Sequence, residues 1–432
     1  MVRFNQCVGI ILMLVRVSVV AVGEQSRIDA ARGAEAYYLY VLQMLSDIQH
    51  LLPSITESAT AAAQWYIQDK SLGLGVDGNP AFVYEAQHRS GGLIGMLNRS
   101  PEKDWRGILL YCLRENRTSE DLEQLVEYRK KKCFIVLFGS VGLLQQARTD
   151  SFKPDAEIIV PAAVNGGLFQ NASGQWVIPT YEISSMASLW VWSAEFVAAC
   201  TRKGKMPPMY QSIRVPGARE RNAKLMNIKF QEHCPPGIKE GELALQWLST
   251  IRKRLAALYE KQKHTIVKIA NLAEHTRSSG GKVFAVTGGH GVGHLLNTSH
   301  SSGLFIQITP QAIDPEKGDI KELFKKGDFL LVAGYDHIFN DAENFHLVDR
   351  FREAGGTMAF CIATYRKDQI EQLKPEDIIL DTGWEYGDAD VELPGYDVKI
   401  LPTSGVLTAA TFFMINAQMI LQEQTEPPDR QR

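Results

Sequence analysis

Two stretches of this sequence, about two hundred residues apart, share one pattern. Residues 106–111 (R-G-I-L-L-Y) form an apolar run that leads through a polar loop into the helical pattern of residues 121–126. Residues 326–332 (K-G-D-F-L-L-V) lead in the same way into residues 343–348. Gly327 follows Gly107 by 220 positions, and Pro402-Thr403 follows Pro179-Thr180 by 223. A nearly constant offset is typical of a duplicated domain, so we expect two copies of one fold.

Apolar strands alternate with helices in both halves. The patterns predict strands at 107–113, 133–138, 156–160, 282–287, 328–333, 357–363 and 377–380, with helices between them and a final helix at 404–422. Such alternation predicts parallel sheets whose two faces are covered by helices. We therefore expect an α/β protein with two doubly wound parallel-sheet domains in tandem, each a flavodoxin-like three-layer αβα unit. The expected domains cover 34–205 and 242–422, joined by a proline-rich linker at 206–241 and followed by a disordered tail at 423–432.

The first residues have the order of an export signal. Arg3 precedes the apolar run from Cys7 to Val22, and small residues end it at Gly23. This order predicts a signal peptide over residues 1–23, with a mis-assigned start or a short anchor as alternatives. We expect an exported protein, periplasmic or secreted, if the leader is real and a cytoplasmic one otherwise. We expect no membrane span after the leader, because we find no later segment with about 20 consecutive apolar residues.

Composition limits the partners. The formal net charge is -3 and no basic stripe carries interleaved aromatic residues, so we do not expect nucleic acid as a partner. Cys112, Cys133 and Cys361 lie in strand-like apolar runs, which predicts buried thiols rather than a disulfide framework.

Ligands of such sheets bind beyond the carboxyl ends of the strands. The first loop of this kind runs from Gly75 through Asn79, and both residues are candidates for substrate binding because a helix follows them. Glu85 and His88 stand three positions apart, so on a helix they would share one face. They could act as base and proton shuttle, or they could be a polar pair on the helix surface.

The second loop covers residues 114–121. Thr118 or Ser119 would cap the following helix, and with Arg117 the same donors suit a phosphate group. Capping alone explains the two hydroxyl residues. Glu115 in the same loop argues against an anion, so both interpretations stay open.

The third and fourth loops lie in the second half. Gly289, His290 and Gly291 follow a predicted strand, and their glycine spacing is not that of a dinucleotide fold. His290 and His294 stand four positions apart, and with His300 and His337 in reach they could form a metal site. The glutamate of a zinc protease does not lie between them, and we predict neither a metal nor a cofactor. The fourth loop contains His337 as a further candidate for substrate binding.

Three stretches together resemble a known family. They are residues 85–92 (E-A-Q-H-R-S-G-G), the segment 207–222 with P-P-M-Y-Q-S, and the run 381–404 with D-T-G, G-D-A, P-G and P-T-S. The chain resembles tandem sugar isomerase (SIS) domain proteins, and in particular a mostly uncharacterised bacterial family described as phosphosugar isomerase-like. The resemblance covers roughly residues 34 to 422.

The resemblance implies roles for the candidates. Glu85 would be the base of an aldose–ketose isomerase, with His88 or a histidine from the other copy assisting ring opening. Arg117, Thr118 and Ser119 would hold an anionic group, and Thr403 and Ser404 of the P-T-S run would contribute to substrate binding. The alternative is a protein that binds or senses a sugar derivative without turnover, because the S-N-S-G phosphate loop is replaced by R-E-N-R-T-S and G-Y-D-H. The fused pair could complete a site within one chain, so we expect a monomer or a homodimer.

Overall fold

The computed structural model describes residues 32–69, 73–100, 105–149, 152–287, 290–308, 323–334, 342–365 and 373–425. The predicted leader at 1–23 and two of the predicted binding residues, Gly289 and His337, lie outside this part of the chain. Of η1 residues His290 and Gly291, only the backbone is described.

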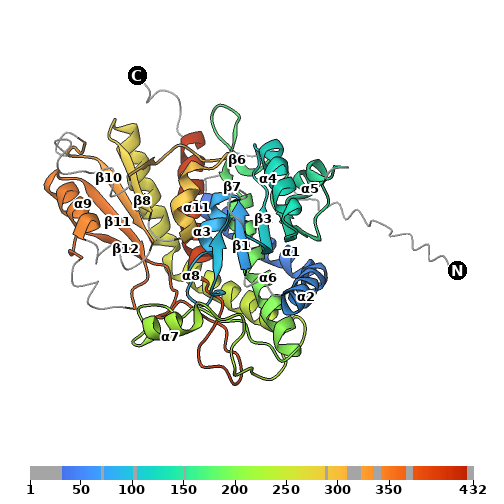
Figure 1. Ribbon diagram of the computed structural model, residues 1–432. Coiled ribbons are helices and arrows are strands. Elements are labelled where there is room, and N and C mark those ends of the chain that lie inside the picture. The colour runs from blue at the N-terminus through green and yellow to red at the C-terminus, as the bar shows by residue number, and fades with distance from the viewer. Residues whose placement is uncertain are drawn as a thin grey trace.

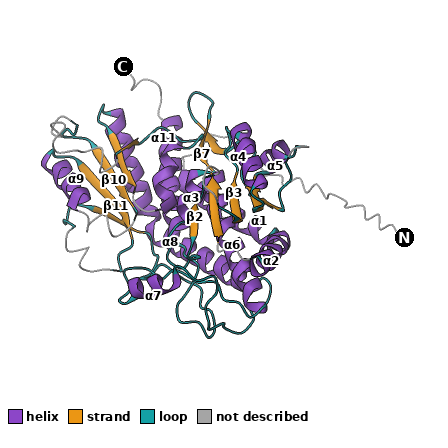
Figure 2. Cartoon of the chain, viewed as in Figure 1, coloured by secondary structure: helices purple, strands orange, loops and turns teal. Residues whose placement is uncertain are grey.

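Two parallel five-stranded sheets form the framework, one in each half (Figures 1 and 2). The first has the order β2-β1-β3-β4-β5, from β1 (Gly73–Gly78), β2 (Met96–Asn98), β3 (Gly107–Cys112), β4 (Phe134–Gly139) and β5 (Ala156–Ile159). The second has the order β12-β11-β10-β8-β9, from β8 (Val283–Thr287), β9 (Ile306–Gln307), β10 (Phe329–Ala333), β11 (Thr357–Ile362) and β12 (Ile378–Asp381). Read from the other edge, the second order is that of the first, which confirms the predicted fold class.

Helices cover both sheets. On the first half, α4 (Thr118–Lys130) and α5 (Val141–Ala147) lie on the outer side, and α9 (Ala342–Glu353) covers the outer side of the second sheet (Figure 1). Helices α8 (Glu242–Ser278) and α11 (Ser404–Thr425) lie between the two sheets and contact strands of the second one. They also pack against α1 (Arg32–His50) and α6 (Tyr181–Arg202) of the first half. Helix α2 (Leu52–Gln68) packs against α6 and the first sheet. The inner helices are therefore a layer that the two halves share.

The hydrophobic core follows this arrangement. One continuous cluster runs from the first sheet through the shared helices to the inner face of the second sheet, and it includes Leu110, Phe196, Leu255, Phe329 and Phe413. A smaller cluster lies between the second sheet and α9, around Phe284, Leu330 and Phe351. Cys112, Cys133 and Cys361 are buried free thiols, as predicted.

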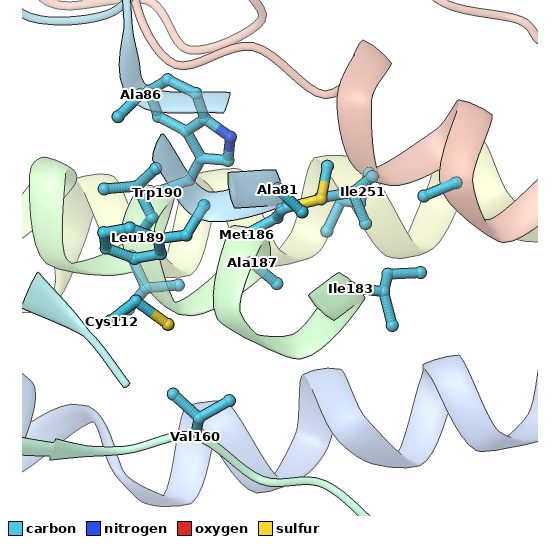
Figure 3. Close-up of a cluster of buried hydrophobic side chains, with 14 of the residues drawn as sticks. Ala81, Ala86, Cys112, Val160, Ile183, Met186, Ala187, Leu189, Trp190 and Ile251 are labelled. Carbon is cyan, nitrogen blue, oxygen red and sulfur yellow. The ribbon is translucent and has the colours of Figure 1, made fainter. Parts of the chain in front are cut away.

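Helix α6 is buried over nearly its whole length. Figure 3 shows Met186, Leu189 and Trp190 of α6 among Ala81 and Ala86 of α3 (Pro80–Ala86) and Ile251 of α8. Helices α6 and α11 are long and apolar enough to cross a membrane, contrary to our expectation that no later segment would be. Their position explains the composition, because a helix packed on all sides by other elements is apolar all round.

The last helix of each half begins at corresponding positions. Helix α6 begins at Tyr181 and α11 at Ser404, an offset of 223, and β4 and β11 begin at Phe134 and Thr357 with the same offset. The second residue is Glu182 in α6 and Gly405 in α11. Helix α11 continues to Thr425, so residues 423–425 are helical and the tail predicted from residue 423 cannot begin before residue 426.

Candidate functional site

A group of polar side chains lies at the carboxyl ends of the strands of the first sheet. Asn79 directly follows β1, Glu115 follows β3, and Glu182 begins the helix that follows the β6–β7 hairpin (Gly167–Gln170 and Trp176–Pro179). His300 comes from the second half, shortly after the 3-10 helix η1 (His290–Asn297). We call these four residues the strand-end cluster.

Asn79 is fixed by the helix that it starts. Its Oδ1 accepts hydrogen bonds from the backbone N–H groups of Ala81 (3.0 Å) and Phe82 (3.3 Å), and Pro80 occupies the first helical position, where its missing N–H costs nothing. Because Oδ1 is used in this way, the Asn79 NH₂ group is the part that hydrogen-bonds the Glu182 carboxyl. The cap of α3 therefore also orients an acid on α6.

Glu182 is a deeply buried carboxyl group. Its side chain is 3% exposed, and burial raises its pKa to about 8, with the charge of Glu115 as the next contribution. The hydrogen bond from Asn79 acts in the opposite direction and does not compensate. Near neutral pH the Glu182 carboxyl therefore holds its proton.

Glu115 faces the imidazole that the second half contributes. His300 Nε2 lies 3.7 Å from Glu115 Oε1, and His300 Nδ1 lies 2.9 Å from the carbonyl oxygen of Trp176. A carbonyl can only accept, so Nδ1 carries the hydrogen and Nε2 is directed to the carboxylate. The His300 ring also lies against the backbone of Gly166, where an added Cβ would be 2.0 Å from His300 Nε2. Burial raises the pKa of Glu115 as well, and His300 opposes this shift.

Two carboxyl oxygens of this cluster are buried and lack a partner. Glu115 Oε2 and Glu182 Oε2 have no hydrogen bond among the residues that the structure describes. Buried polar atoms are nearly always paired, so such oxygens indicate a place for a ligand with hydrogen-bond donors. Two carboxyl groups with raised pKa and a histidine can also move protons near neutral pH.

A second polar group lies where the two halves meet, and we call it the motif junction: Glu85, Arg89, Asp388 and Ser404. Arg89 contacts both carboxylates, at 3.4 Å from Glu85 Oε1 and 3.1 Å from Asp388 Oδ2, and it donates to Ser404 Oγ at 2.6 Å. Ser404 Oγ donates to Asp388 Oδ2 at 2.8 Å. All four side chains are buried.

The stretches that carry the family resemblance meet at this junction. Gly91 N donates to the Tyr210 carbonyl and Tyr210 N to the Gly92 carbonyl, both at 2.7 Å. Leu401 N donates to the Gly91 carbonyl at 2.8 Å. The stretches 85–92, 207–222 and 381–404 therefore form one structural contact between the halves.

This arrangement corrects the predicted pair of Glu85 and His88. Helix α3 ends at Ala86, so the two residues do not share a helix face. Glu85 is buried, with Trp190 Nε1 donating to its Oε1 at 2.9 Å, whereas His88 is exposed with a φ of 48°. The polar pair that the spacing suggested does not exist.

The predicted phosphate loop is also arranged differently. The N-cap of α4 is Arg117, which makes no capping hydrogen bond with its side chain, and not Thr118 or Ser119. Arg117 is 61% exposed beside Glu120. Thr118 Oγ1 donates to Gln146 at 3.3 Å, and Ser119 is exposed. Arg114, the other arginine of this loop, lies 2.6 Å from the buried carboxylate of Asp121.

The other predicted binding residues that the structure describes do not belong to the strand-end cluster. Gly75 lies inside β1 rather than at its end, against the Trp105 ring. Thr403 is buried and donates to Asp390 at 2.5 Å, and Ser404 belongs to the motif junction. His290 and Gly291 are the first residues of η1, which begins three positions after the last residue of β8. Within the described ranges, no three His, Cys, Asp or Glu side chains lie close enough together to hold a metal ion.

Surface shape does not single out the strand-end cluster. An open hollow of about 730 Å³ lies between α2 and the start of α8, around Thr56 and Leu245, and one of about 470 Å³ lies beside Tyr396. Neither includes a residue of the cluster. We place the candidate site by its titratable groups and its position at the strand ends, since this is where open α/β sheets bind ligands.

Sequence reasoning missed three of the four cluster residues as site residues. Asn79 was predicted to bind substrate. Glu115 was considered only as a residue that would repel an anion. Glu182 lies in a helix whose sequence is that of a buried core helix. His300 was noticed only in a group of possible metal ligands. The signal that could have found Glu182 is the offset of 223, because a carboxylate stands there opposite a glycine, Gly405.

Comparison with known proteins gives structural neighbours only. No family profile and no curated protein matches the chain. It is similar to the C-terminal domain of glucosamine-fructose-6-phosphate aminotransferase from Francisella tularensis, with 12% identity, a TM-score of 0.48, and 89% of this chain and 96% of that chain covered. It is also similar to tagatose-6-phosphate ketose/aldose isomerase from Escherichia coli (11%, TM-score 0.45, 94% and 98%) and glucosamine-6-phosphate deaminase from Thermotoga maritima (10%, TM-score 0.40, 88% and 93%).

The aligned regions span most of this chain and most of each of these solved proteins. The fold class rests on the strand order of its own two sheets.

Proposed function

We propose that this chain binds a carbohydrate derivative at the strand-end cluster. The observation that carries the proposal is the pair of buried carboxyl oxygens, on Glu115 and Glu182, that have no partner in the described part of the chain. Sugars present several hydroxyl donors on a compact ring, and carboxyl oxygens accept from them. The family resemblance of the sequence supports the same class of ligand.

The cluster favours a ligand without a phosphate group at this place. An anion would face Glu115, and the nearby guanidinium groups are already engaged, Arg114 by Asp121 and Arg117 by Glu120. Binding of a neutral or cationic derivative avoids this repulsion.

Thermal unfolding tests the binding proposal. A neutral sugar at about 100 times its Kd stabilises the folded chain by about 2.7 kcal/mol, which raises the unfolding midpoint. Glu115→Gln and Glu182→Gln should remove this rise, whereas Glu120→Gln, an exposed carboxylate on the neighbouring helix, should keep it. If no sugar changes the midpoint, or if Glu120→Gln matters as much as the cluster variants, the site is wrong.

A second candidate function is aldose–ketose isomerisation, and the unlike environments of the two carboxyl groups favour it. Glu115, beside His300, would take the proton from C2 of an open-chain aldose, and protonated Glu182 would donate to the carbonyl oxygen to give an enediol. Return of a proton to C1, with loss of the proton on O2, gives the ketose.

Proton NMR in D₂O distinguishes turnover from binding. An isomerase replaces the hydrogen on C2 of its substrate by deuterium, and Glu115→Gln should abolish this exchange. Glu85→Gln is the informative comparison, because Glu85 lies in the motif junction. If Glu85→Gln, with its fold intact, abolishes exchange and Glu115→Gln does not, the base is Glu85, as the resemblance implies.

A further inference from the structure

We infer that the ligand of the strand-end cluster carries a positively charged amine, which binds between the carboxyl groups of Glu115 and Glu182. The inference rests on the proposed sugar-binding function and adds the charge of the ligand. It concerns an ammonium group on a sugar derivative and needs no phosphate.

The first reason is the pair of carboxyl groups itself. Glu182 is 3% exposed, the charge of Glu115 contributes to its raised pKa, and each of the two carboxyl groups has one buried oxygen without a partner among the described residues. Bringing two carboxylates out of water without a cation is costly, and an ammonium group with three donors can serve both oxygens at once.

The second reason is that the protein supplies little positive charge of its own here. Arg114 is held by Asp121 at 2.6 Å, and Arg117 is exposed beside Glu120. His300 lies 3.7 Å from Glu115, and its Nδ1 is used by the Trp176 carbonyl. The other described side chains that hydrogen-bond the pair, Ser299 at Glu115 and Asn79 at Glu182, are neutral. No described arginine or lysine side chain forms an ion pair with Glu115 or Glu182, so a cationic ligand would meet carboxyl groups that the protein has not already neutralised with a guanidinium or ammonium group.

The third reason separates an organic cation from a metal ion. Hard metal cations need several oxygen ligands at short distance. No set of three His, Cys, Asp or Glu side chains with that geometry occurs in the described ranges of the chain. An ammonium group needs only acceptors, and two are present.

A consequence for protonation makes the inference measurable. Burial holds the pKa of Glu182 at about 8, so its proton must leave when an ammonium group takes its place. Both carboxyl groups are then ionised, and Glu182 has no proton to donate to a carbonyl oxygen. The inference therefore favours a protein that holds its ligand over an isomerase.

Isothermal titration calorimetry of the full chain at about pH 6.5 tests this with three matched probes, D-glucosamine, N-acetyl-D-glucosamine and D-glucose, and with D-glucose 6-phosphate as a fourth, anionic probe. The sugar amine is charged at this pH and the acetylated amine is not. We expect glucosamine to bind about tenfold more tightly or better than the two neutral sugars, as charge-assisted hydrogen bonds are the stronger kind. Its binding heat should change with the ionisation enthalpy of the buffer, which shows release of a proton.

Variants assign the effect to the cluster. Glu182→Gln should reduce the glucosamine affinity to that of glucose and abolish the buffer dependence, whereas Glu120→Gln should change neither. The comparison of the three probes on the wild-type chain does not depend on any variant folding.

Each other outcome has a clear meaning. Equal binding of the three sugars, tighter binding of D-glucose 6-phosphate than of glucosamine, or glucosamine binding that Glu182→Gln leaves unchanged overturns the amine inference while sugar binding stands. Absence of binding by all four probes overturns the proposed function together with the inference.

Discussion

The strand-end cluster and the motif junction lie at comparable places in the two halves, but among the described residues only the motif junction has an arginine that pairs with its carboxylates. Each lies where the first turn of the last helix of one half meets a segment from the other half, α6 with His300 in the first case and α11 with Glu85 in the second. In the motif junction, Arg89 contacts both carboxylates. In the strand-end cluster no arginine or lysine of the described chain does so.

Position two of the last helix shows how the difference arises. A Cβ at Gly405 of α11 would lie 2.2 Å from Glu85 Oε1, so a carboxylate from the other half fills the space of a side chain there. At the corresponding Glu182 of α6, the helix carries its own carboxyl group. The first arrangement is closed by protein atoms, and the second keeps acceptors for a ligand. The comparison teaches that equivalent positions of one fold can hold a closed ion-pair contact in one half and a carboxyl group with an oxygen left without a described partner in the other.

The largest expected effect comes from breaking the motif junction. Arg89→Met leaves the carboxylates of Glu85 and Asp388 buried without their cation, and such a loss costs about 3–5 kcal/mol of the free energy of unfolding. Urea unfolding measures it. Arg117→Met, at an exposed arginine, should cost under about 1 kcal/mol. Similar losses in the two variants would contradict a structural role for the junction.

Glu182 of the strand-end cluster and Asp388 of the motif junction should both make the free energy of unfolding depend on pH, over different ranges. Glu182 has a pKa of about 8 and Asp388 about 7, both raised mainly by burial. A raised pKa means that the folded state binds the proton more tightly than the unfolded state. The contribution of each carboxyl group to the free energy of unfolding is therefore fully present below about pH 4, and it is lost as the pH rises through 7 to 8.

Glu182→Gln should therefore gain about 2–4 kcal/mol relative to the wild-type chain between pH 5 and pH 8. Asp388→Asn should lose stability at every pH, because Arg89 loses a buried partner, and its difference from the wild-type chain should change with pH in a lower window that ends near pH 7. The measurement is the difference in free energy of unfolding between variant and wild type at each pH, with Glu120→Gln as control. A difference that does not change with pH would show that Glu182 is ionised in the folded protein.

A smaller effect is expected from Gly405→Ala. The added methyl group meets the Glu85 carboxylate, and overpacking of this kind costs about 1–3 kcal/mol. A second change, Glu85→Ala, should recover part of that loss, which a double-mutant cycle of unfolding free energies detects. Gly142→Ala in α5, where nothing lies within 4 Å of the added atom, should be neutral or slightly stabilising. Additive losses at 405 and 85 would refute the contact.

The smallest effect concerns the contact between α3 and η1. The rings of Tyr84 and His294 stack with centroids 4.0 Å apart, and Tyr84 is 47% exposed. Aromatic pairs contribute about 0.5–1.5 kcal/mol, and exposure places this one at the low end. A cycle of Tyr84→Ala and His294→Ala should give a coupling below about 1 kcal/mol. A larger coupling would mean that this stack, rather than the motif junction, holds the halves together.

Most of the fold could be predicted because it follows from repeated local patterns. The strands β3, β4, β10 and β11 are apolar runs between helical patterns, and this alternation predicted their parallel pairing. The short strand β2 and the β6–β7 hairpin were not predicted, because two- to four-residue strands leave little periodicity in the sequence.

The candidate site was harder to predict, for a physical reason. The resemblance drew attention to Glu85, yet Arg89, four positions later, already contained the information that this carboxylate is paired. Glu182 and His300 become neighbours of Glu115 only through long-range packing, which one sequence does not display. The environment of a carboxylate, not its spacing, decides whether it binds a ligand.

The shared inner layer has a consequence for the independence of the halves. Helices α6 and α11 are buried by elements of both halves, and one core cluster continues across them. A gene truncated between the halves would thus encode a fragment whose longest apolar helix meets water along one side. The two halves share one hydrophobic core, and we expect that neither half folds stably when the other is removed.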